Sequence, residues 1–209
     1  MRRFAVVLLG FWISWPALAA APCILVLGDS LSAGHGIDID RGWVRLLQQR
    51  LNQQDYNYRV VNASISGETT RGARARIDRL IKTEAPAITI VELGGNDGLR
   101  GIQLNEMRNN LDYIIRSLRK AGSEVLLLPM KLPPNYGPAY TRRFEDVYRQ
   151  LARSDDVVLG TFILDGIALN PKLMQADGIH PRAQAEPMML DTVWASLKPL
   201  LRSRVGTGK

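Results

Sequence analysis

The 209-residue chain is poor in two residue types that often carry chemistry, with one cysteine, Cys23, and two histidines, His35 and His180. A single cysteine excludes an intramolecular disulfide and a cysteine-based metal cluster. Pro22 directly precedes Cys23, which argues against lipoprotein processing there, so we interpret the thiol as structural. No group of histidines and carboxylates has metal-ligand spacing, and we expect no metal and no cofactor. Histidine-dependent chemistry must therefore use one of two side chains.

Two further classes of protein are disfavoured by what is absent. The formal net charge is +7, but the basic residues are scattered and are not interleaved with aromatic ones. We therefore expect no nucleic-acid partner. Beyond the N-terminus, no apolar run approaches the ~20 residues that a membrane-spanning helix needs, so we expect no stable membrane insertion.

Residues 1–19 have the pattern of a secretory signal peptide. Arg2 and Arg3 precede the apolar run 4–15, and Ala17-Leu18-Ala19 has the small-x-small form of a cleavage site. The alternative is an uncleaved anchor, which the short apolar run disfavours. Cleavage near Ala19 would remove two arginines and lower the formal charge from +7 to +5. We expect a periplasmic or secreted protein in which residues 20–209 form a single, monomeric domain.

Apolar runs typical of strands alternate along the chain with amphipathic stretches typical of helices. The runs 87–91 and 125–128 are apolar on nearly all positions, which is typical of a parallel sheet covered on both faces. This alternation predicts an α/β fold with an open, doubly wound sheet and right-handed crossovers. The expected strands are 23–28, 58–62, 87–93, 124–129 and 156–161, and the expected helices are 41–54, 70–84, 103–121, 139–154 and 183–202.

Polar, glycine-containing segments follow several of the expected strands. Ligands of such sheets bind outside the carboxyl ends of the strands, so these segments should meet at one edge. The segments are Gly28-Asp29-Ser30, Asn62 to Gly67, Gly94-Gly95-Asn96-Asp97 and Asp177-Gly178-Ile179-His180.

Ser30, His180 and Asp177 could together perform acyl transfer. A serine needs a neighbouring base to become a nucleophile, and a neutral histidine can be that base. Asp177 lies three residues before His180, across a glycine-containing turn, and could hold the imidazole in the required tautomer. Taken separately, Ser30 could be a turn or helix-cap serine, and His180 a surface histidine. His35 has no acid at a matching spacing, so we interpret it as an exposed residue of the rim.

Acyl transfer also requires hydrogen-bond donors for the developing oxyanion. The candidates are the backbone N–H groups of Ser30 and Gly67 and the side-chain amide of Asn96. Turn geometry alone could also account for Gly67 and Asn96. The remaining polar residues of these segments are expected to organise the loops through hydrogen bonds, namely Asp29, Asn62 and Asp97.

A Gly-x-Ser-x-Gly elbow is absent, which argues against the common α/β-hydrolase layout. The segments 28–32, Gly67, 94–97 and 177–181 instead resemble the four sequence blocks of the SGNH (GDSL-type) hydrolases. The segments 61–67, 91–101 and 132–137 resemble one subfamily of them, the bacterial periplasmic thioesterase, protease I, lysophospholipase and arylesterase enzymes. The resemblance covers about residues 23–200.

This resemblance implies a three-layer, flavodoxin-like α/β/α fold with a five-stranded parallel sheet in the order 2-1-3-4-5. It implies a Ser30–His180–Asp177 triad and an oxyanion hole of Ser30, Gly67 and Asn96. In the subfamily, a mobile loop matching 98–103 closes over acyl chains, and a segment matching 132–133 lines the acyl groove. The implied substrate-binding residues are Gly98, Leu99, Arg100, Ile102, Leu132 and Pro133. Glu68 departs from the usual aspartate, and residues 160–170 match only loosely.

The sequence thus predicts a serine hydrolase of carboxylic esters and acyl thioesters, including lysophospholipids, that works through an acyl-enzyme. One alternative is an esterase of acetylated carbohydrates on the same fold. Another is a periplasmic protein that binds acyl chains or lipids without catalysis, although Ser30, Asp177 and His180 at one edge argue against it.

Overall fold

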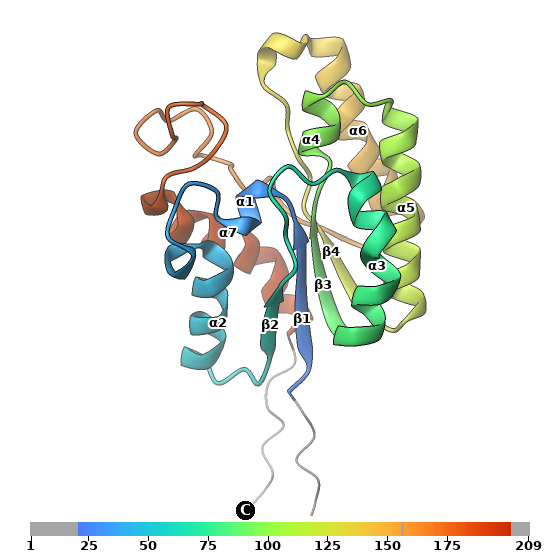
Figure 1. Ribbon diagram of the computed structural model, residues 1–209, viewed down its shortest axis with the longest axis vertical. Coiled ribbons are helices and arrows are strands. Elements are labelled where there is room, and N and C mark those ends of the chain that lie inside the picture. Colours follow the sequence, from blue (N-terminus) through green and yellow to red (C-terminus); the bar gives the residue numbers. More distant parts are fainter. Residues whose placement is uncertain (1–20, 156, 202–209) are drawn as a thin grey trace, which may run out of the picture.

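A five-stranded parallel sheet forms the centre of the protein, in a computed structural model that describes residues 21–155 and 157–201 (Figure 1). The strand order is β2-β1-β3-β4-β5, which confirms the predicted order 2-1-3-4-5. The predicted signal peptide, 1–19, lies outside the described residues. The strands are β1 (Cys23–Gly28), β2 (Arg59–Asn62), β3 (Pro86–Glu92), β4 (Glu124–Leu127) and β5 (Val158–Leu159).

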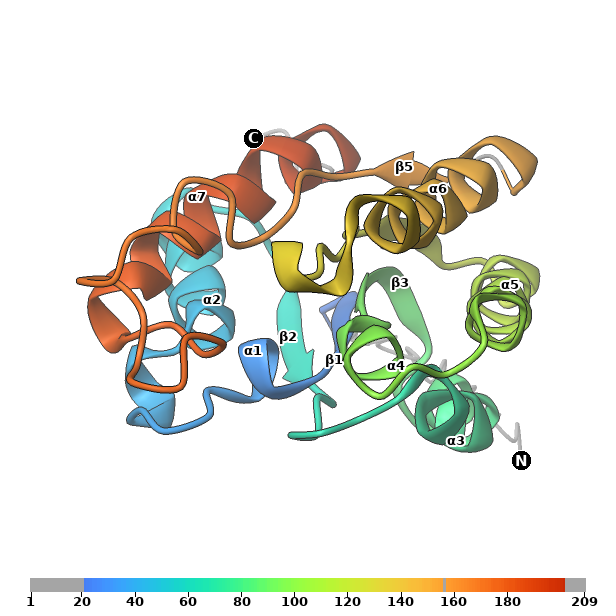
Figure 2. The ribbon, with the colours of Figure 1, turned by 90° about the horizontal axis from the view of Figure 1, so that it is seen from above.

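Helices cover both faces of the sheet. Crossovers between parallel strands are as a rule right-handed, so the reversal of strand order after β2 places the later helices on the opposite face. Figure 2 shows α2 (Trp43–Gln53) and α7 (Glu186–Leu197) on one face of the sheet and α3 (Thr70–Glu84), α5 (Leu104–Lys120) and α6 (Pro138–Ser154) on the other, in agreement with Figure 1. On the first face, α2 packs against α7. On the second, α5 packs between α3 and α6.

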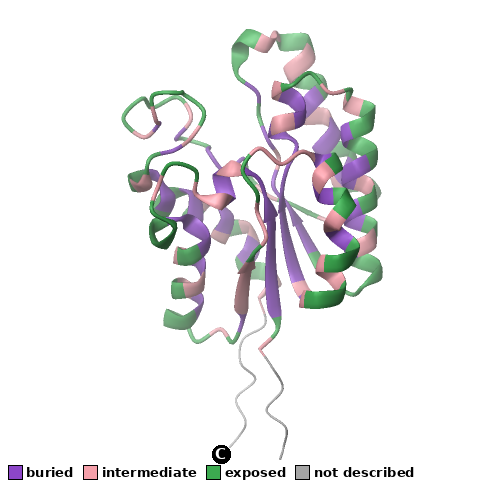
Figure 3. Ribbon diagram, viewed as in Figure 1, coloured by how far each residue is buried: buried purple, intermediate pink, exposed green. Residues whose placement is uncertain are grey.

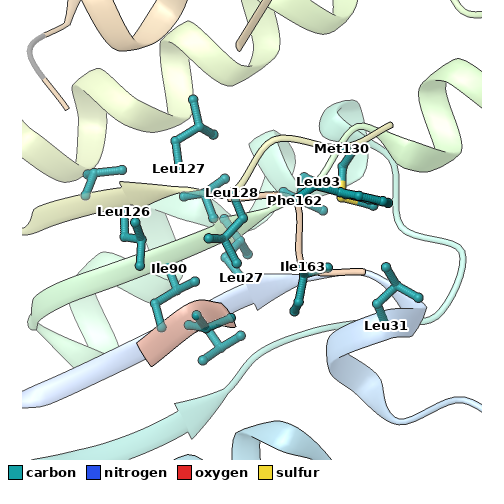
Figure 4. Packing of buried hydrophobic residues seen from close by; sticks show 14 of the residues in the cluster. Leu27, Leu31, Ile90, Leu93, Leu126, Leu127, Leu128, Met130, Phe162 and Ile163 are labelled. Atoms are coloured by element: carbon teal, nitrogen blue, oxygen red, sulfur yellow. The ribbon is translucent and has the colours of Figure 1, made fainter. Parts of the chain in front are cut away.

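The hydrophobic core lies between the sheet and both helical layers. The central strands are buried on both faces, whereas the helices bury only the stripe that faces the sheet (Figure 3). Figure 4 shows part of this core. Leu27, Ile90 and Leu126 come from three adjacent strands, and they belong to the same buried cluster as Ile163 from the segment after β5. Burial on both faces explains why these strands read as continuous apolar runs.

Two expected elements differ clearly from the structure. The strand expected at 156–161 pairs with β4 only at Val158 and Leu159, and residue 156 lies outside the described residues. The helix expected at 183–202 is divided into a 3₁₀ turn (Ala183–Ala185), α7 and a second 3₁₀ turn (Lys198–Leu200). Pro199 explains the second division, because proline has no N–H for an α-helical hydrogen bond.

Two short helices at the carboxyl edge of the sheet were not expected from the sequence. The first, α1 (Ser30–Ala33), follows β1 directly, and α4 (Gly95–Leu99) follows β3. Each is shorter than the span over which helical periodicity can be recognised. Among the described residues, no helix is both long enough and apolar enough to cross a membrane.

Glu186 is a buried acid that ties the two helices of the first face together. Its side chain is 1% exposed, and its Oε2 accepts a hydrogen bond of 2.8 Å from the backbone N–H of Trp43, at the start of α2. Burial raises the pKa of Glu186 to about 7, and the hydrogen bond from Trp43 offsets part of this effect.

We expect Glu186→Gln to remove a pH-dependent part of the stability. Between the unfolded pKa and about 7, the folded state keeps a proton that the unfolded state loses, so stability falls as the pH rises. The raised pKa corresponds to about 3 kcal/mol between about pH 4 and about pH 8. A glutamine can still accept from Trp43 but cannot ionise.

Urea unfolding of both proteins across this pH range measures the effect. The free energy of unfolding of the variant, relative to the original protein, should increase steadily toward alkaline pH. Glu106→Gln, at an exposed carboxylate in the first turn of α5, is the control and should show no such trend. Parallel pH curves for Glu186→Gln and the original protein would contradict the assignment.

Candidate active site

Ser30 lies where β1 ends and α1 begins, at the carboxyl edge of the sheet. Asp29 caps this short helix, with its Oδ1 accepting a 3.1 Å hydrogen bond from the N–H of Leu31. Gly34 ends the helix in the left-handed region, at a φ of 73°. The Ser30 N–H lies in the first turn, where an α-helix offers no internal acceptor. The hydroxyl and the N–H of Ser30 are therefore both placed at the edge of the sheet.

Asp177 and His180 form a tight turn in the long segment that follows β5. Oδ1 of Asp177 accepts from the N–H groups of His180 and Ile179, at 3.0 and 2.9 Å. Its Oδ2 lies 2.7 Å from Nδ1 of His180. These hydrogen bonds hold the pKa of Asp177 well below its usual value, and the two from His180 have the largest effect. The carboxylate therefore stays ionised and fixes both the turn and the ring of His180.

A hydrogen bond joins His180 to Ser30, which lies far from it in the sequence. Nε2 of His180 lies 2.9 Å from Oγ of Ser30, 150 residues away in sequence. The three groups are therefore aligned as carboxylate, imidazole and hydroxyl. In this geometry His180 can withdraw the hydroxyl proton of Ser30 while the Asp177 carboxylate orients the imidazole.

His35 lies against His180, a contact that the sequence did not predict. The two ring centroids are 4.2 Å apart and the planes are tilted by 37°. Nε2 of Gln175 donates to the carbonyl of His35 at 2.8 Å and to that of Pro181 at 2.9 Å. The Gln175 backbone N–H donates to the carbonyl of His180 at 2.8 Å. His35 is an exposed rim residue, as expected, but its ring also packs against the candidate base.

Asn96 and Gly67 occupy neighbouring segments of the rim. Asn96 is in α4 and lines the same pocket as Ser30 and His180. Its Nδ2 donates to Oδ2 of Asp29 at 3.1 Å, which leaves the second amide hydrogen for a ligand. Gly67 has a φ of 78°, and its carbonyl accepts a 3.0 Å hydrogen bond from the side chain of Arg100.

A pair of buried acids lies behind Ser30. Glu92, the last residue of β3, is fully buried, and its Oε2 accepts from the hydroxyl of Ser32 at 2.6 Å and from the N–H of Asp29 at 3.3 Å. Burial raises the pKa of Glu92 well above its usual value, with the neighbouring Asp29 as the next cause. Burial also raises the pKa of Asp29. The raised pKa favours the neutral form of Glu92, and its hydrogen bonds with Ser32 and Asp29 hold the loop that carries Ser30.

The other polar rim residues organise the loops, as the sequence predicts. Asp97 accepts from the N–H of Thr70 at 2.9 Å and from its hydroxyl at 2.6 Å, which fixes the start of α3. Asn62 donates to the carbonyl of Ser32 at 2.8 Å and accepts from the N–H of Ser64 at 3.1 Å.

A pocket of about 800 Å³ opens beside Ser30, Asn96 and His180. Leu99, Leu132 and Pro133 line it, where the sequence resemblance placed substrate. The sequence did not identify the other walls, which come from the segments after β4 and β5. The apolar residues among them are Met130, Pro134, Phe162, Leu164, Ala168, Leu169, Met174 and Ile179.

Gly98, Arg100 and Ile102, also expected to contact substrate, are outside the described lining of this pocket. Gly98 supports the wall from behind, since a Cβ there would lie 2.6 Å from a methyl group of Leu132. Arg100 turns toward the Gly67 carbonyl, and the N–H of Ile102 donates to the carbonyl of Asp97 at 2.9 Å.

Residues 21–155 and 157–201 contain no group of three or more histidine, cysteine, aspartate or glutamate side chains that could hold a metal ion. The described geometry brings together a hydroxyl, a histidine in contact with a carboxylate, and amide donors beside an apolar pocket.

Known proteins match this chain over most of its length. The profile of the GDSL-like Lipase/Acylhydrolase family matches residues 26–186. Esterase TesA of Pseudomonas aeruginosa is 50% identical over 183 residues, which are 88% of this chain and 91% of that protein. Thioesterase 1/protease 1/lysophospholipase L1 of Escherichia coli K12 is 42% identical, over 88% of this chain and 86% of its own. A crystal structure of TesA superposes with a TM-score of 0.83 at 48% identity, covering 86% of this chain and 99% of the other.

Proposed function

The chain belongs to the GDSL-like lipase/acylhydrolase family and is a hydrolase of carboxylic esters and thioesters, and on this basis we propose that Ser30 is its nucleophile. His180 acts as the general base and Asp177 orients it. The observation that carries the proposal is the pair of hydrogen bonds at His180, 2.9 Å to Ser30 Oγ and 2.7 Å to Asp177 Oδ2.

In the first half of the reaction, Oγ of Ser30 attacks the carbonyl carbon of the ester or thioester while Nε2 of His180 takes the hydroxyl proton. The carbonyl oxygen becomes an oxyanion. His180 then gives its proton to the leaving oxygen or sulfur, and the bond to the alcohol or thiol breaks. Ser30 is left acylated. The ionised Asp177 stabilises the imidazolium that exists between these two proton transfers.

The oxyanion is stabilised by the backbone N–H groups of Ser30 and Gly67 and by Nδ2 of Asn96. Support for this role of Asn96 comes from its hydrogen bond to Asp29, which fixes the direction of the amide before substrate binds. Donors that need no reorganisation during the reaction contribute most to such stabilisation.

In the second half, a water molecule replaces the alcohol or thiol. His180 withdraws a proton from this water as it attacks the acyl carbon, and then returns the proton to Oγ of Ser30 as the acid leaves. The cycle consumes one water and releases a carboxylic acid, with the serine regenerated and no redox change.

The pocket favours acyl chains over acetylated carbohydrate. Its volume of about 800 Å³ and its many aliphatic and aromatic walls suit a hydrocarbon chain, whereas an acetyl group would leave most of that surface in contact with water. We therefore propose fatty acyl esters and lysophospholipids as the substrate class.

The cellular location follows from the pattern of residues 1–19. We propose that the chain is exported and cleaved near Ala19. Thioesters of coenzyme A are scarce outside the cytoplasm, so lysophospholipids and esters from outside the cell are the substrates that an exported enzyme meets.

Labelling with an alkyl fluorophosphonate tests the proposed site. Such a reagent phosphonylates only an activated serine: an O–P bond forms to Oγ and the P–F bond breaks with release of fluoride. We therefore expect one label per folded chain, on Ser30, located by peptide mass spectrometry. Urea-unfolded protein is the matched control and should remain unlabelled. A folded protein that binds fatty acid but takes no label would instead be a non-catalytic acyl-binding protein.

A further inference from the structure

The pocket is bounded at its mouth by exposed apolar side chains. Leu169 is 91% exposed and Ile179 is 42% exposed, and both line the pocket. They belong to the segment after β5, which rises as loops beyond the edge of the sheet (Figure 1). A single exposed leucine is ordinary on a protein surface. Leu169 is notable because it lies at the entrance to an apolar cavity.

A second group of exposed apolar residues comes from the segment after β4. Pro133 and Pro134 are exposed and line the same pocket as Leu169. Figures 1 and 2 show that this segment also projects beyond the sheet, apart from the loops after β5. We refer to 131–134 as the proline lip and to 165–172 as the leucine lip.

Each lip also carries a lysine. Lys131 begins the proline lip, and its Nζ lies 3.6 Å from Oδ1 of Asp165 in the leucine lip. The two side chains are 48% and 59% exposed, and a pair so exposed to water is weak. Lys172 ends the leucine lip and is exposed. The lips therefore combine aliphatic groups with two ammonium groups, Lys131 and Lys172, against one carboxylate, Asp165.

Apolar side chains flanked by lysines suit the boundary of a phospholipid layer. The aliphatic groups enter the acyl region, and the ammonium groups remain at the level of the phosphates. Positive charge near the surface adds attraction to anionic lipid. A proline lip and a leucine lip on either side of one pocket would place its opening against the lipid.

We propose that the proline lip and the leucine lip dock on a phospholipid surface, so that an acyl chain moves from the lipid layer into the pocket without crossing water. This inference rests on the proposed function, because it assigns to that pocket a substrate held in a lipid layer. It predicts that the enzyme acts on lysophospholipid at a surface and that docking does not require catalysis.

Binding is measured by co-sedimentation with vesicles, using Ser30→Ala protein so that no lipid is hydrolysed. We expect binding to vesicles of phosphatidylcholine mixed with phosphatidylglycerol, and weaker binding to phosphatidylcholine alone. Leu169→Asp, in the same background, should weaken binding about tenfold, because a charge replaces a side chain that enters the acyl region. Met188→Asp is the matched control, since Met188 is 41% exposed but lies outside the pocket lining, and should bind unchanged.

A second variant tests the electrostatic attraction to anionic lipid and leaves the pocket lining unchanged. Lys172 does not line the pocket, so Lys172→Glu should hydrolyse a soluble aryl ester normally. Its binding to phosphatidylglycerol vesicles and its activity on lysophospholipid in mixed micelles should both fall several-fold. Equal binding by Leu169→Asp and Met188→Asp, or no binding to either kind of vesicle, would overturn the docking proposal. Labelling of Ser30 would be unaffected by that outcome, so the two proposals can fail separately.

Discussion

Replacing Ser30 by alanine is expected to lower kcat/KM for a short-chain aryl ester by about 10⁴-fold or more. The variant loses the only hydroxyl within hydrogen-bonding distance of Nε2 of His180 among the described contacts. The pocket and the amide of Asn96 remain, so the residual rate should still exceed that in water. KM should change little, because the pocket walls are unaltered.

Initial rates of purified protein measure this effect, with thermal unfolding to establish that the fold is intact. Ser66→Ala is the matched control, an exposed serine on the rim segment next to Gly67 that should keep nearly full activity. A Ser30→Ala protein that retains activity within tenfold of the original would assign the nucleophile to another residue.

Asp177→Asn is expected to lower kcat by about 10⁴-fold while leaving the turn in place. The amide oxygen can still accept from the N–H groups of Ile179 and His180, as Oδ1 of the carboxylate does now. The amide nitrogen would then face Nδ1 of His180 and donate to it. The imidazole proton would move to Nε2, which faces Ser30 and could no longer accept the hydroxyl proton.

The measurement is kcat at saturating substrate, together with the fluorophosphonate labelling rate, which should fall in parallel. Asp191→Asn offers a control, because Asp191 is an exposed carboxylate of α7 that pairs with Arg50 at 2.7 Å. A loss of less than tenfold in Asp177→Asn would mean that His180 is oriented by other contacts, such as its packing against His35.

The fold was largely predictable because its central strands are buried on both faces. Continuous apolar runs such as 87–91 mark parallel strands, and their alternation with amphipathic stretches sets the topology. β5 was expected to be longer than it is. It is an edge strand with an exposed face, so its sequence is less constrained by burial.

The convergence of the residues proposed to react was predictable because parallel strands bring their carboxyl ends to one edge. Ser30, Asn96 and His180 follow three different strands, and the structure places all three in the lining of one pocket. The contact of His35 with His180 was not predictable. Gln175 joins the two segments by hydrogen bonds to the carbonyls of His35 and Pro181, and it lies 140 residues from His35 with no local sequence pattern that indicates this contact.

The pocket wall formed by the segment between β5 and α7 could not be predicted from the sequence either. Between β5 and α7 the chain contains no regular strand or α-helix in its described part, so no periodicity indicates which side chains face inward. Phe162 and Leu169 contribute to this wall from consecutive turns, which are closed by local backbone hydrogen bonds such as that from the N–H of Ala168 to the carbonyl of Leu164.

The segment after β5 contains a stretch that is anchored beside His180 and, before it, the leucine lip, which carries exposed side chains such as Leu169 above the buried Ile167. This division affects how the enzyme can diversify. Met174 and Pro181 form an isolated bridge, and Gln175 ties the same stretch to His35. The leucine lip lies outside this anchored stretch. Substitutions at exposed positions of the leucine lip, such as Leu169, can therefore reshape the entrance while His180 keeps its position. New substrate ranges are accessible in small steps, each of which preserves the rate of the chemistry.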